Sequence, residues 1–505
     1  MDTHSPGTKE EGAWGGSDLP PSRQLRLLHL SEIDEADELE QVWLNDFRDV
    51  QAVLAEGGGN DEKVQAALQE RASSDKGHAR VVNGLLFGNI CDRSRSPEFF
   101  RYLTLVVRDG YAYVCKQLQR IVNEKFTKMI DRGAVQASPQ QIQLLELVRR
   151  LIGLDVGNGI DRVFLALLRQ IQGGSVRETN RWLTRILLQI SIENKAWLLE
   201  QLDIVHIVFY TFCRVAADHS DPKLEKMRRQ EAALCSEIWR ERPAECRKLG
   251  RDAVRVMQDV ARVPEFDQLW KDLLEQPETV GIRDLGDLLC VRTPNAVLAS
   301  RLTPEMEQQL LFIVQHVKMG QQQRYQKWFM SRWGLSTSEG ETLIPDLVRY
   351  ICCVYHPPNE VIRSDVVQRW AAVGWLLTTA RSETIKANTK LALFYDWLFY
   401  ERKSKDHPGD SVMVVEPAAL LIIRSISKWT EITADLMEFL FAAADDWCPR
   451  YRQLCRRGIY NAASECLHLG VIPKTTSGRA GWHLVSAYGL APDKLGAGLR
   501  ARVRA

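Results

Sequence analysis

The sequence predicts an all-α protein, a HEAT-like helical-repeat scaffold (α-solenoid) without a significant β-sheet. Apolar residues recur at helical spacing along most of the 505 residues, and short connections join successive helical stretches. Neighbouring stretches pair into units of ~40 residues, although no consensus letters repeat. The only strand-like run, residues 412–415, is too short to seed a sheet. Periodicity alone leaves an irregular helical bundle open as the alternative.

Composition and pattern divide the chain into four segments. Residues 1–31 are polar and rich in Gly and Pro, which predicts a disordered leader. Residues 32–80 form an acidic helical lead-in that is broken by the glycines at 57–59. Regular helical spacing then predicts one HEAT-like scaffold domain over residues 81–470. Residues 471–505 contain many Gly and Arg and predict a divergent, poorly ordered tail.

Local signals place several helix starts. Ser138 supplies an N-cap, Pro139 occupies the first helical position, and Gln141 completes a capping box before an apolar periodic run. The same kinds of signal predict helices over residues 160–171, 222–239 and 304–317.

Charge and cysteine content limit the function classes. The 66 Lys and Arg residues nearly balance the 65 Asp and Glu residues, and the net charge of +1 lacks the basic excess of most proteins that bind a phosphate backbone. The sequence contains no run of 18 apolar residues that would predict a membrane span, so we expect no membrane contact. The 11 cysteines show no framework spacing, which indicates reduced thiols in the cytosol or nucleus.

The sequence predicts no catalytic residue, no metal site and no cofactor. It contains no phosphate-binding loop, no metalloprotease helix motif and no hydrolase nucleophile elbow. Residues 157–159, Gly-Asn-Gly, indicate a turn between helices. Cys352 and Cys353 are adjacent, and Cys448 lies seven positions before Cys455, so neither pair has zinc-ligand spacing. We therefore do not expect an enzyme.

One segment, residues 321–333, alternates basic and aromatic residues and has two interpretations. The first is a single-stranded nucleic-acid surface in which cations contact phosphates and an aromatic ring stacks on bases. Its residues are Arg324, Lys327, Trp328 and Arg332. The second is an amphipathic helix with an aromatic core stripe. That stripe consists of Tyr325, Trp328, Phe329 and Trp333.

Several blocks of letters resemble the Integrator complex subunit 3 family, whose members also belong to the SOSS complex, the sensor of single-stranded DNA. They lie at residues 260–272, 301–307, 320–326, 347–361, 369–379 and 390–399. The last block, KLALFYDWLF, is long and specific. With weaker similarity from Tyr102 to Asp252, the resemblance covers roughly residues 80 to 465.

The resemblance implies a non-catalytic scaffold of HEAT-like units. It implies that the N-terminal half of family members holds an OB-fold single-stranded-DNA-binding protein and a small extended subunit for double-strand-break repair and damage signalling. Nucleic acid is then contacted mainly through the OB-fold partner. The resemblance also implies other Integrator subunits as partners, roles in small nuclear RNA processing and RNA polymerase II transcription, and a location in the nucleus, with the cytoplasm as a second compartment.

We expect partner binding to concentrate on a few aromatic and arginine anchors early in the ordered chain. The predicted set is Phe99, Arg101, Tyr102, Arg108, Tyr111, Tyr113 and Lys116. The alternative is that Phe99, Tyr102 and Tyr113 pack the first helical pair.

Overall fold

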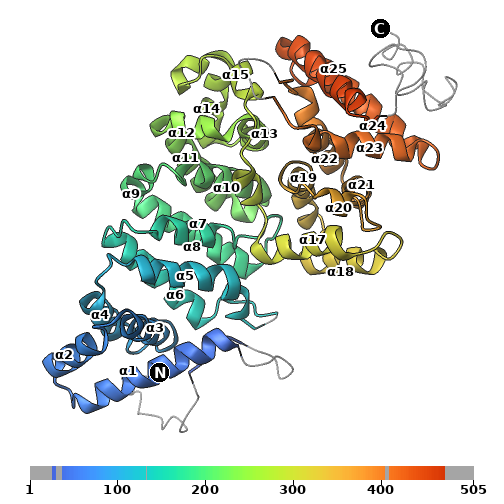
Figure 1. The fold of residues 1–505 in the computed structure, drawn as a ribbon. Helices are drawn as coiled ribbons and strands as arrows, with labels where there is room; N and C mark the ends of the chain where they lie inside the picture. Colours follow the sequence, from blue (N-terminus) through green and yellow to red (C-terminus); the bar gives the residue numbers. More distant parts are fainter. Residues whose placement is uncertain (1–24, 30–36, 132, 404–408, 473–505) are drawn as a thin grey trace, which may run out of the picture. The chain divides into compact units, whose positions relative to one another are not determined.

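The protein is all-α over the residues that the computed structural model describes, which are 25–29, 37–131, 133–403 and 409–472 (Figure 1). Within these residues it forms 25 α-helices and no strand, and one isolated antiparallel bridge joins Lys318 to Val366. The predicted helical solenoid is confirmed. The strand-like run instead contains a 3-10 turn, Val412–Val414.

The chain divides into two compact units, residues 1–105 and 106–505. The boundary that the sequence suggested at residue 80 therefore lies inside the first unit. Residues 1–24, 30–36 and 473–505, which include most of the predicted leader and tail and the first residues of the lead-in, lie outside the described residues.

The first unit is a small helical group. Its helices are α1 (Glu38–Glu56), α2 (Asp61–Arg71), α3 (Asp75–Cys91) and α4 (Ser96–Val106), whose last residue crosses the unit boundary. Phe47 of α1 packs against Phe87 and Phe99, with ring centroids 5.2 and 5.6 Å away. Helices α1 and α3 approach closely at Gly84, where a Cβ atom would lie 2.5 Å from the Asp46 carbonyl oxygen. A larger residue at position 84 would force these helices apart.

Part of the predicted leader is folded onto this unit. The backbone amides of Leu27 and Leu28 donate to Oε1 of Glu40 at 2.7 and 3.0 Å, and both leucines are buried. A carboxylate that accepts two amide hydrogen bonds fixes this segment against α1. Residues 25–29 therefore depart from the predicted disordered leader.

The second unit begins with one stack of helices that ascends from α5 to α15 (Figure 1). The stack contains α5 (Ala112–Lys125), α6 (Pro139–Gly153), α7 (Ile160–Leu168), α8 (Glu178–Glu193), α9 (Lys195–Glu200), α10 (Val205–Asp218), α11 (Glu225–Glu241), α12 (Pro243–Cys246), α13 (Arg251–Val260), α14 (Pro264–Glu275) and α15 (Leu285–Cys290). Helices adjacent in sequence, such as α10 and α11, pack against each other, as expected for repeat architecture.

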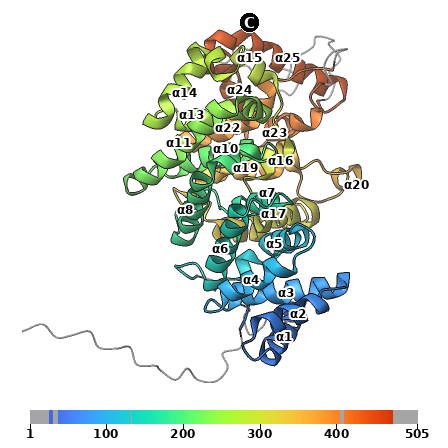
Figure 2. The same ribbon diagram turned by 90° about the vertical axis from the view of Figure 1, so that its left-hand side faces the viewer.

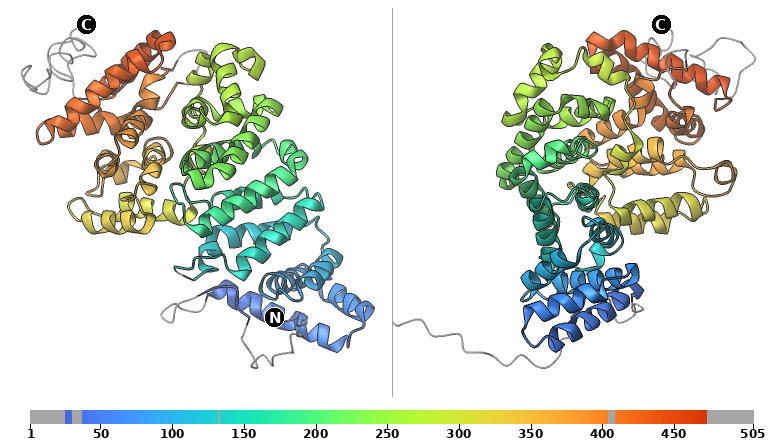
Figure 3. Two further views of the ribbon diagram at one scale, coloured as in Figure 1. Left: turned by 180° about the vertical axis from the view of Figure 1, so that it is seen from behind. Right: turned by 60° about the vertical axis from the view of Figure 1, so that its left-hand side comes forward.

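After α16 (Asn295–Ala299), the chain returns and builds a second stack beside the first, as the view from behind shows (Figure 3). This stack contains α17 (Pro304–His316), α18 (Gln323–Trp333), α19 (Ile344–Arg349), α20 (Asn359–Ile362), α21 (Arg369–Thr379), α22 (Glu383–Leu398), α23 (Glu416–Ser425), α24 (Thr430–Ala442) and α25 (Arg452–His468). Figure 2 shows α20 projecting from this stack.

A buried set of arginines and aspartates, the interior network, joins the two stacks. Arg214 of α10 and Arg255 of α13 donate to Asp346 of α19 at 3.1 and 3.2 Å. Arg301 adds a third hydrogen bond to this carboxylate at 3.3 Å. The Asp346 side chain is 1% exposed. Burial opposes its ionisation, but the charges of Arg214, Arg301 and Arg255 outweigh burial and lower the pKa of Asp346.

The interior network continues through a second pair of aspartates. Arg349 of α19 donates to Asp252 of α13 at 2.5 Å and also to Asp396 of α22. Arg251 of α13 donates to Asp396 at 2.9 Å. The side chains of Asp252 and Asp396 are 0 and 2% exposed. Because every charge here has a hydrogen-bonded partner, the stacks can bury these ions between them.

The predicted helix starts agree well with the structure. Ser138 Oγ accepts from the Gln141 amide at 3.1 Å, while Gln141 Oε1 accepts from the Ser138 amide at 3.3 Å, which confirms the capping box. Thr303 caps α17 through the Met306 amide at 3.2 Å. The helix expected from residue 222 starts as a 3-10 turn, and its α-helical part, α11, begins at Glu225.

Candidate interaction surface

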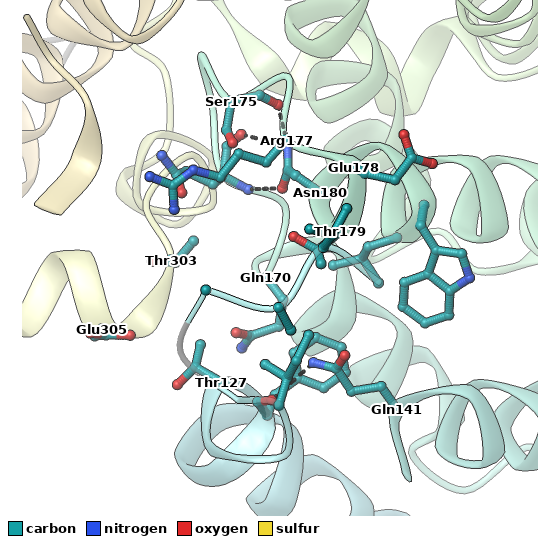
Figure 4. Close-up of a pocket in the computed structure, with 18 of the residues that line it drawn as sticks. Thr127, Gln141, Gln170, Ser175, Arg177, Glu178, Thr179, Asn180, Thr303 and Glu305 are labelled. Carbon is teal, nitrogen blue, oxygen red and sulfur yellow. Dashed lines mark hydrogen bonds between the residues drawn. The ribbon is translucent and has the colours of Figure 1, made fainter. Parts of the chain in front are cut away.

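A pocket of about 540 Å³ lies in the second unit and draws on five separate segments (Figure 4). Its lining comes from residues 126–131 and 133–135 after α5, residues 170–183 around the start of α8, Thr303 and Glu305 at the start of α17, and Arg332 and Trp333 at the end of α18. Gln141 of α6 also contributes. The pocket therefore lies where the first stack meets the beginning of the second.

Asn180, in the first turn of α8, holds one wall of the pocket in place. Its side-chain oxygen accepts from the Gln172 amide at 2.8 Å. Its side-chain nitrogen donates to the carbonyl oxygens of Gln172 and Ser175 at 2.9 and 2.8 Å, and Figure 4 shows Asn180 beside Ser175. The side chain of Gln172 reaches the other stack, where its Nε2 donates to the Trp333 carbonyl oxygen at 3.3 Å. This wall is thus organised before any ligand binds.

The charges around the pocket are mixed. Arg332 binds the Glu305 carboxylate through two hydrogen bonds of 2.9 and 3.2 Å. Arg177 is exposed at the N-cap position of α8 and has no polar partner among the described residues. No side chain caps the first turn of α8. Among its described lining residues, the pocket therefore combines the unpaired cation of Arg177 with acidic groups.

The outer face of α18 carries an exposed aromatic residue among cations. Arg324, Trp328 and Arg332 are spaced four residues apart and so share one helix face. Trp328 is 45% exposed, and Lys327 beside it is also exposed. We call Arg324, Lys327, Trp328 and Arg332 the α18 surface. It ends at the pocket, because Arg332 belongs to both.

The predicted aromatic core stripe of this helix is wrong at one position. Phe329 and Trp333 are buried, and Trp333 donates to the Gln309 side chain at 2.9 Å. Tyr325 is half-buried, with its ring 5.6 Å from that of Phe312. Trp328 is instead 45% exposed and is not part of a buried stripe. The helix is amphipathic, but its aromatic residues lie on both sides.

The first part of the predicted partner-binding set lies in the first unit. Phe99 is 0% exposed and belongs to the core beside Phe47. Arg101 donates to Asp61 at 2.5 and 2.8 Å, and the Tyr102 hydroxyl donates to the same carboxylate at 2.8 Å. These two donors lower the pKa of Asp61 to about 2. Phe99 and Tyr102 therefore pack the helices, as the alternative interpretation stated.

The rest of that set lies in the second unit. Arg108 and Lys116 are exposed, while Tyr111 and Tyr113 are half-buried. Tyr111 starts α5 with φ +69°, a left-handed conformation. The Tyr113 amide donates to Asp109 at 2.8 Å, so this turn is held locally. Binding of a partner by Arg101, Arg108 and Lys116 stays a prediction.

Cysteine and metal chemistry is not indicated by the described part of the chain. All 11 cysteines are free thiols, and no group of three His, Cys, Asp or Glu residues there is arranged to hold a metal ion. Burial raises the pKa of Cys352 and of Cys455 to about 12, so both stay protonated at neutral pH. No described helix is long and apolar enough to cross a bilayer.

Comparison with known proteins shows which family shares this sequence. Residues 76–477 match the model of the Integrator complex subunit 3 N-terminal family. The chain belongs to this family. It is 38% identical over 441 residues to Integrator complex subunit 3 of Danio rerio, covering 87% of this chain and 42% of that relative. For the Homo sapiens protein the identity is 37% over 454 residues, covering 88% and 42%.

A more distant member is the Integrator complex subunit 3 homolog of Dictyostelium discoideum, 34% identical over 501 residues, covering 95% of this chain and 31% of that relative. The chain thus spans less than half the length of these relatives. The resemblance inferred from the sequence is confirmed. The family segment starts in α3, so the pocket and the α18 surface both lie inside it.

Sequence reasoning missed most of the pocket. Arg177, Asn180 and Trp182 carry no motif, and the lining residues of α17 and α18, from Thr303 to Trp333, are more than a hundred residues away in sequence. The only available signal was the uncapped start of a helix after Gly173 and Gly174. By contrast, the sequence did single out Arg332, as part of the predicted nucleic-acid surface, although its place at the pocket was not foreseen.

Proposed function

We propose that this chain is a non-catalytic helical scaffold subunit of an Integrator complex. The observation that carries the proposal is the family match over residues 76–477. The architecture supports it, because stacked helical units offer long surfaces for several partners. The strongly perturbed carboxylates also support it, since Asp346 and Asp396 are committed to ion pairs inside the fold rather than facing a pocket.

The test is recovery of the complex from cells. An epitope-tagged chain, expressed in cells of its source, is purified at moderate salt, and bound proteins are identified by mass spectrometry. We expect other Integrator subunits to co-purify. Recovery of none of them, with the tagged chain soluble and folded, contradicts the proposal.

The finer function we propose is that of the scaffold in a SOSS-type sensor of single-stranded DNA. The scaffold would hold an OB-fold single-stranded-DNA-binding protein and a small extended subunit in the nucleus, for double-strand-break repair and damage signalling. The same chain would serve small nuclear RNA processing and RNA polymerase II transcription through Integrator. The near-neutral net charge of +1 supports this proposal, because a scaffold without a basic excess leaves binding of the DNA strand to its OB-fold partner. Two experiments test this proposal. Retention of the OB-fold protein by the immobilised chain tests partner binding, and nuclear fluorescence of a tagged chain tests the location.

One observation favours a second candidate, direct binding of single-stranded nucleic acid by the α18 surface. Trp328 is 45% exposed and lies between Arg324 and Arg332 on one helix face, an arrangement that lets a base stack while cations contact phosphates. This candidate requires oligo-dT to bind the chain alone, with an affinity that falls steeply with salt. Trp328→Ala should then weaken binding, whereas Trp429→Ala, at another tryptophan that is 47% exposed, should not.

A further inference from the structure

Four aromatic or apolar side chains and two cations are exposed or half-buried on the hairpin that α17 and α18 form. We call this set the hairpin surface, which consists of Phe312, Met319, Arg324, Tyr325, Lys327 and Trp328. We propose that it binds an amphipathic helix of a partner protein with an acidic polar side, so that the partner adds a helix to the end of the second stack. The inference rests on the proposed scaffold function only in taking a protein as the partner.

The apolar part of this surface is unexpected for its place in the fold. Helices α17 and α18 are the first of the second stack and lie at one end of it (Figure 1). The terminal layer of a helical-repeat protein normally carries a polar outer face, because no further repeat covers it. Here Phe312, Met319 and Trp328 are 43, 39 and 45% exposed. Exposed large apolar side chains that gather in one place indicate an interaction site.

The apolar side chains belong to both helices of the hairpin. The ring of Phe312 of α17 lies 5.6 Å from that of Tyr325 of α18, and Trp328 follows Tyr325 by three residues on the same side of α18. Phe329, by contrast, contacts the next layer of the stack, because its ring lies 6.0 Å from that of Trp375 in α21. Two adjacent helices with exposed apolar side chains can accept a third helix as a further layer.

The hairpin is fixed at both of its ends. At the turn between the helices, the Met319 amide donates to the Asp365 carbonyl oxygen at 2.7 Å. At the other end, Arg332 of α18 binds Glu305 of α17 at 2.9 and 3.2 Å. These contacts hold the hairpin surface in one geometry before a partner arrives, which lowers the entropy lost on binding.

The charge of the hairpin surface favours an acidic partner. Arg324 and Lys327 are exposed, and neither has an acidic partner among the described residues. Lys318 and Arg332, the remaining Lys and Arg residues of the hairpin, each pair with a carboxylate. Two unpaired cations beside apolar side chains complement a helix that carries apolar residues on one side and carboxylates next to them.

The same features disfavour two other occupants. A second copy of the chain, bound through this surface, would bring its own Arg324 and Lys327 against those of the first copy, and like charges repel. A nucleic-acid strand presents a phosphate at every nucleotide, whereas two of the four Lys and Arg residues of the hairpin are already paired. Met319 also has no ring on which a base can stack. The hairpin surface therefore favours an acidic amphipathic helix.

Site-specific photo-cross-linking tests the inference in the assembled complex. A tagged chain with p-benzoylphenylalanine in place of Trp328 is expressed in cells of its source, the cells are irradiated, and the attached molecule is identified by mass spectrometry. The label at Lys327 repeats the measurement from a neighbouring position. The label at Trp429, which is 47% exposed, is the matched control. Circular dichroism verifies that each purified chain is folded.

We expect positions 327 and 328 to attach to one helix of a partner protein, with apolar residues on one side and Asp or Glu beside them. A synthetic peptide of that helix is then measured by fluorescence polarisation. It should bind the Arg324→Glu/Lys327→Glu variant at least about tenfold more weakly than the wild type, the loss expected for charge-assisted contacts. It should bind Lys226→Glu/Arg262→Glu like the wild type, because these two exposed cations lie outside the hairpin and have no acidic partner among the described residues.

Attachment at positions 327 and 328 that does not exceed attachment at position 429 overturns the inference. Attachment to nucleic acid, to a second copy of the chain or to a segment without an acidic amphipathic helix overturns it as well, and so does equal binding of the peptide to the wild type and to Arg324→Glu/Lys327→Glu. If other Integrator subunits still co-purify with the chain in those cases, the scaffold function stands and only the assignment of the hairpin surface fails.

Discussion

The interior network and the α18 surface use the same residue type in opposite ways. In the interior network, Arg214, Arg301 and Arg349 are at most 5% exposed, and each donates to an aspartate of the other stack or of its own. On the α18 surface, Arg324 is exposed, and the one polar contact found for it within the described part of the chain is with its neighbour Tyr325. Arginine content alone therefore says little about partner binding, because burial and pairing decide which arginines are available.

The difference has an energetic consequence. A buried ion pair costs several kcal/mol per ion in desolvation, so removing one partner leaves a charge that nothing compensates. An exposed arginine keeps its hydration and contributes little to stability. We expect substitutions in the interior network to change the free energy of unfolding, and substitutions on the α18 surface to change binding only.

The largest expected effect is that of Asp346→Ala. This change leaves Arg214, Arg255 and Arg301 facing one another in the interior, and we expect the free energy of unfolding to fall by about 3–5 kcal/mol. Urea denaturation followed by circular dichroism measures it. The matched control is Asp287→Ala, which breaks an exposed pair with Arg283 and should cost less than about 1 kcal/mol. Equal losses in the two variants would remove the distinction between buried and exposed pairs.

The free energy of unfolding should depend on pH through the aspartates of the interior network. The folded-state pKa values of Asp346 and Asp396 are lowered, because arginine charges outweigh burial. Their stabilisation is therefore fully present above the unfolded-state pKa of about 3.9 and is lost as pH falls below it toward the folded values. Asp259, whose pKa burial raises, acts in the opposite direction. Denaturation curves between neutral and acidic pH should show this loss, with a shallower slope in Asp346→Ala. The same slope in the variant and the wild type would contradict it.

A smaller effect is expected at the exposed pair of the first unit. Asp61→Asn removes the charge that Arg101 and Tyr102 contact, but Arg101 and Asp61 are both exposed, so their ion pair contributes little to stability. We expect the melting temperature to stay close to that of the wild type. Burial and the hydrogen bond to Asp61 raise the pKa of Tyr102 to about 12, so this pKa should decrease in the variant. Ultraviolet titration of the tyrosines measures it, and a pKa that does not move means that the contact is not maintained in solution.

The smallest effect on stability belongs to the α18 surface. Arg324→Glu combined with Lys327→Glu changes two exposed side chains, so the free energy of unfolding should stay within about 0.5 kcal/mol of the wild type. Chemical denaturation of the double variant provides the value. A loss as large as that of Asp346→Ala would mean that these cations also hold the fold.

The helix starts that the sequence predicted are determined by residues close together in the chain. The capping box at Ser138 and the cap at Thr303 depend on residues three positions away, so reading along the chain is enough to find them. The interior network has no such signal. Arg214 lies 132 residues from Asp346, and Arg251 lies 145 residues from Asp396, so only the return of the second stack brings them together.

Trp328 shows that a helical pattern of aromatic residues does not establish burial. One of the two interpretations of this helix assigned Trp328 to the core stripe with Phe329, but periodicity identifies only that a face is apolar, not that another helix covers it. Family resemblance added what local patterns could not, since the run at residues 390–399 pointed to the family that the comparison later confirmed. Within that run, Asp396 pairs with Arg251 in the interior.

The most direct test of the account is size-exclusion co-migration of the purified chain with an OB-fold single-stranded-DNA-binding protein from the same organism, with and without oligo-dT. The account predicts that the two proteins co-migrate without DNA and that oligo-dT enters the chain's peak only when the OB-fold protein is present. Oligo-dT retained by the chain alone would contradict the division between scaffold and strand binder and favour the α18 surface. Failure of the chain to hold the OB-fold protein would contradict the proposal that it is the scaffold of a SOSS-type complex.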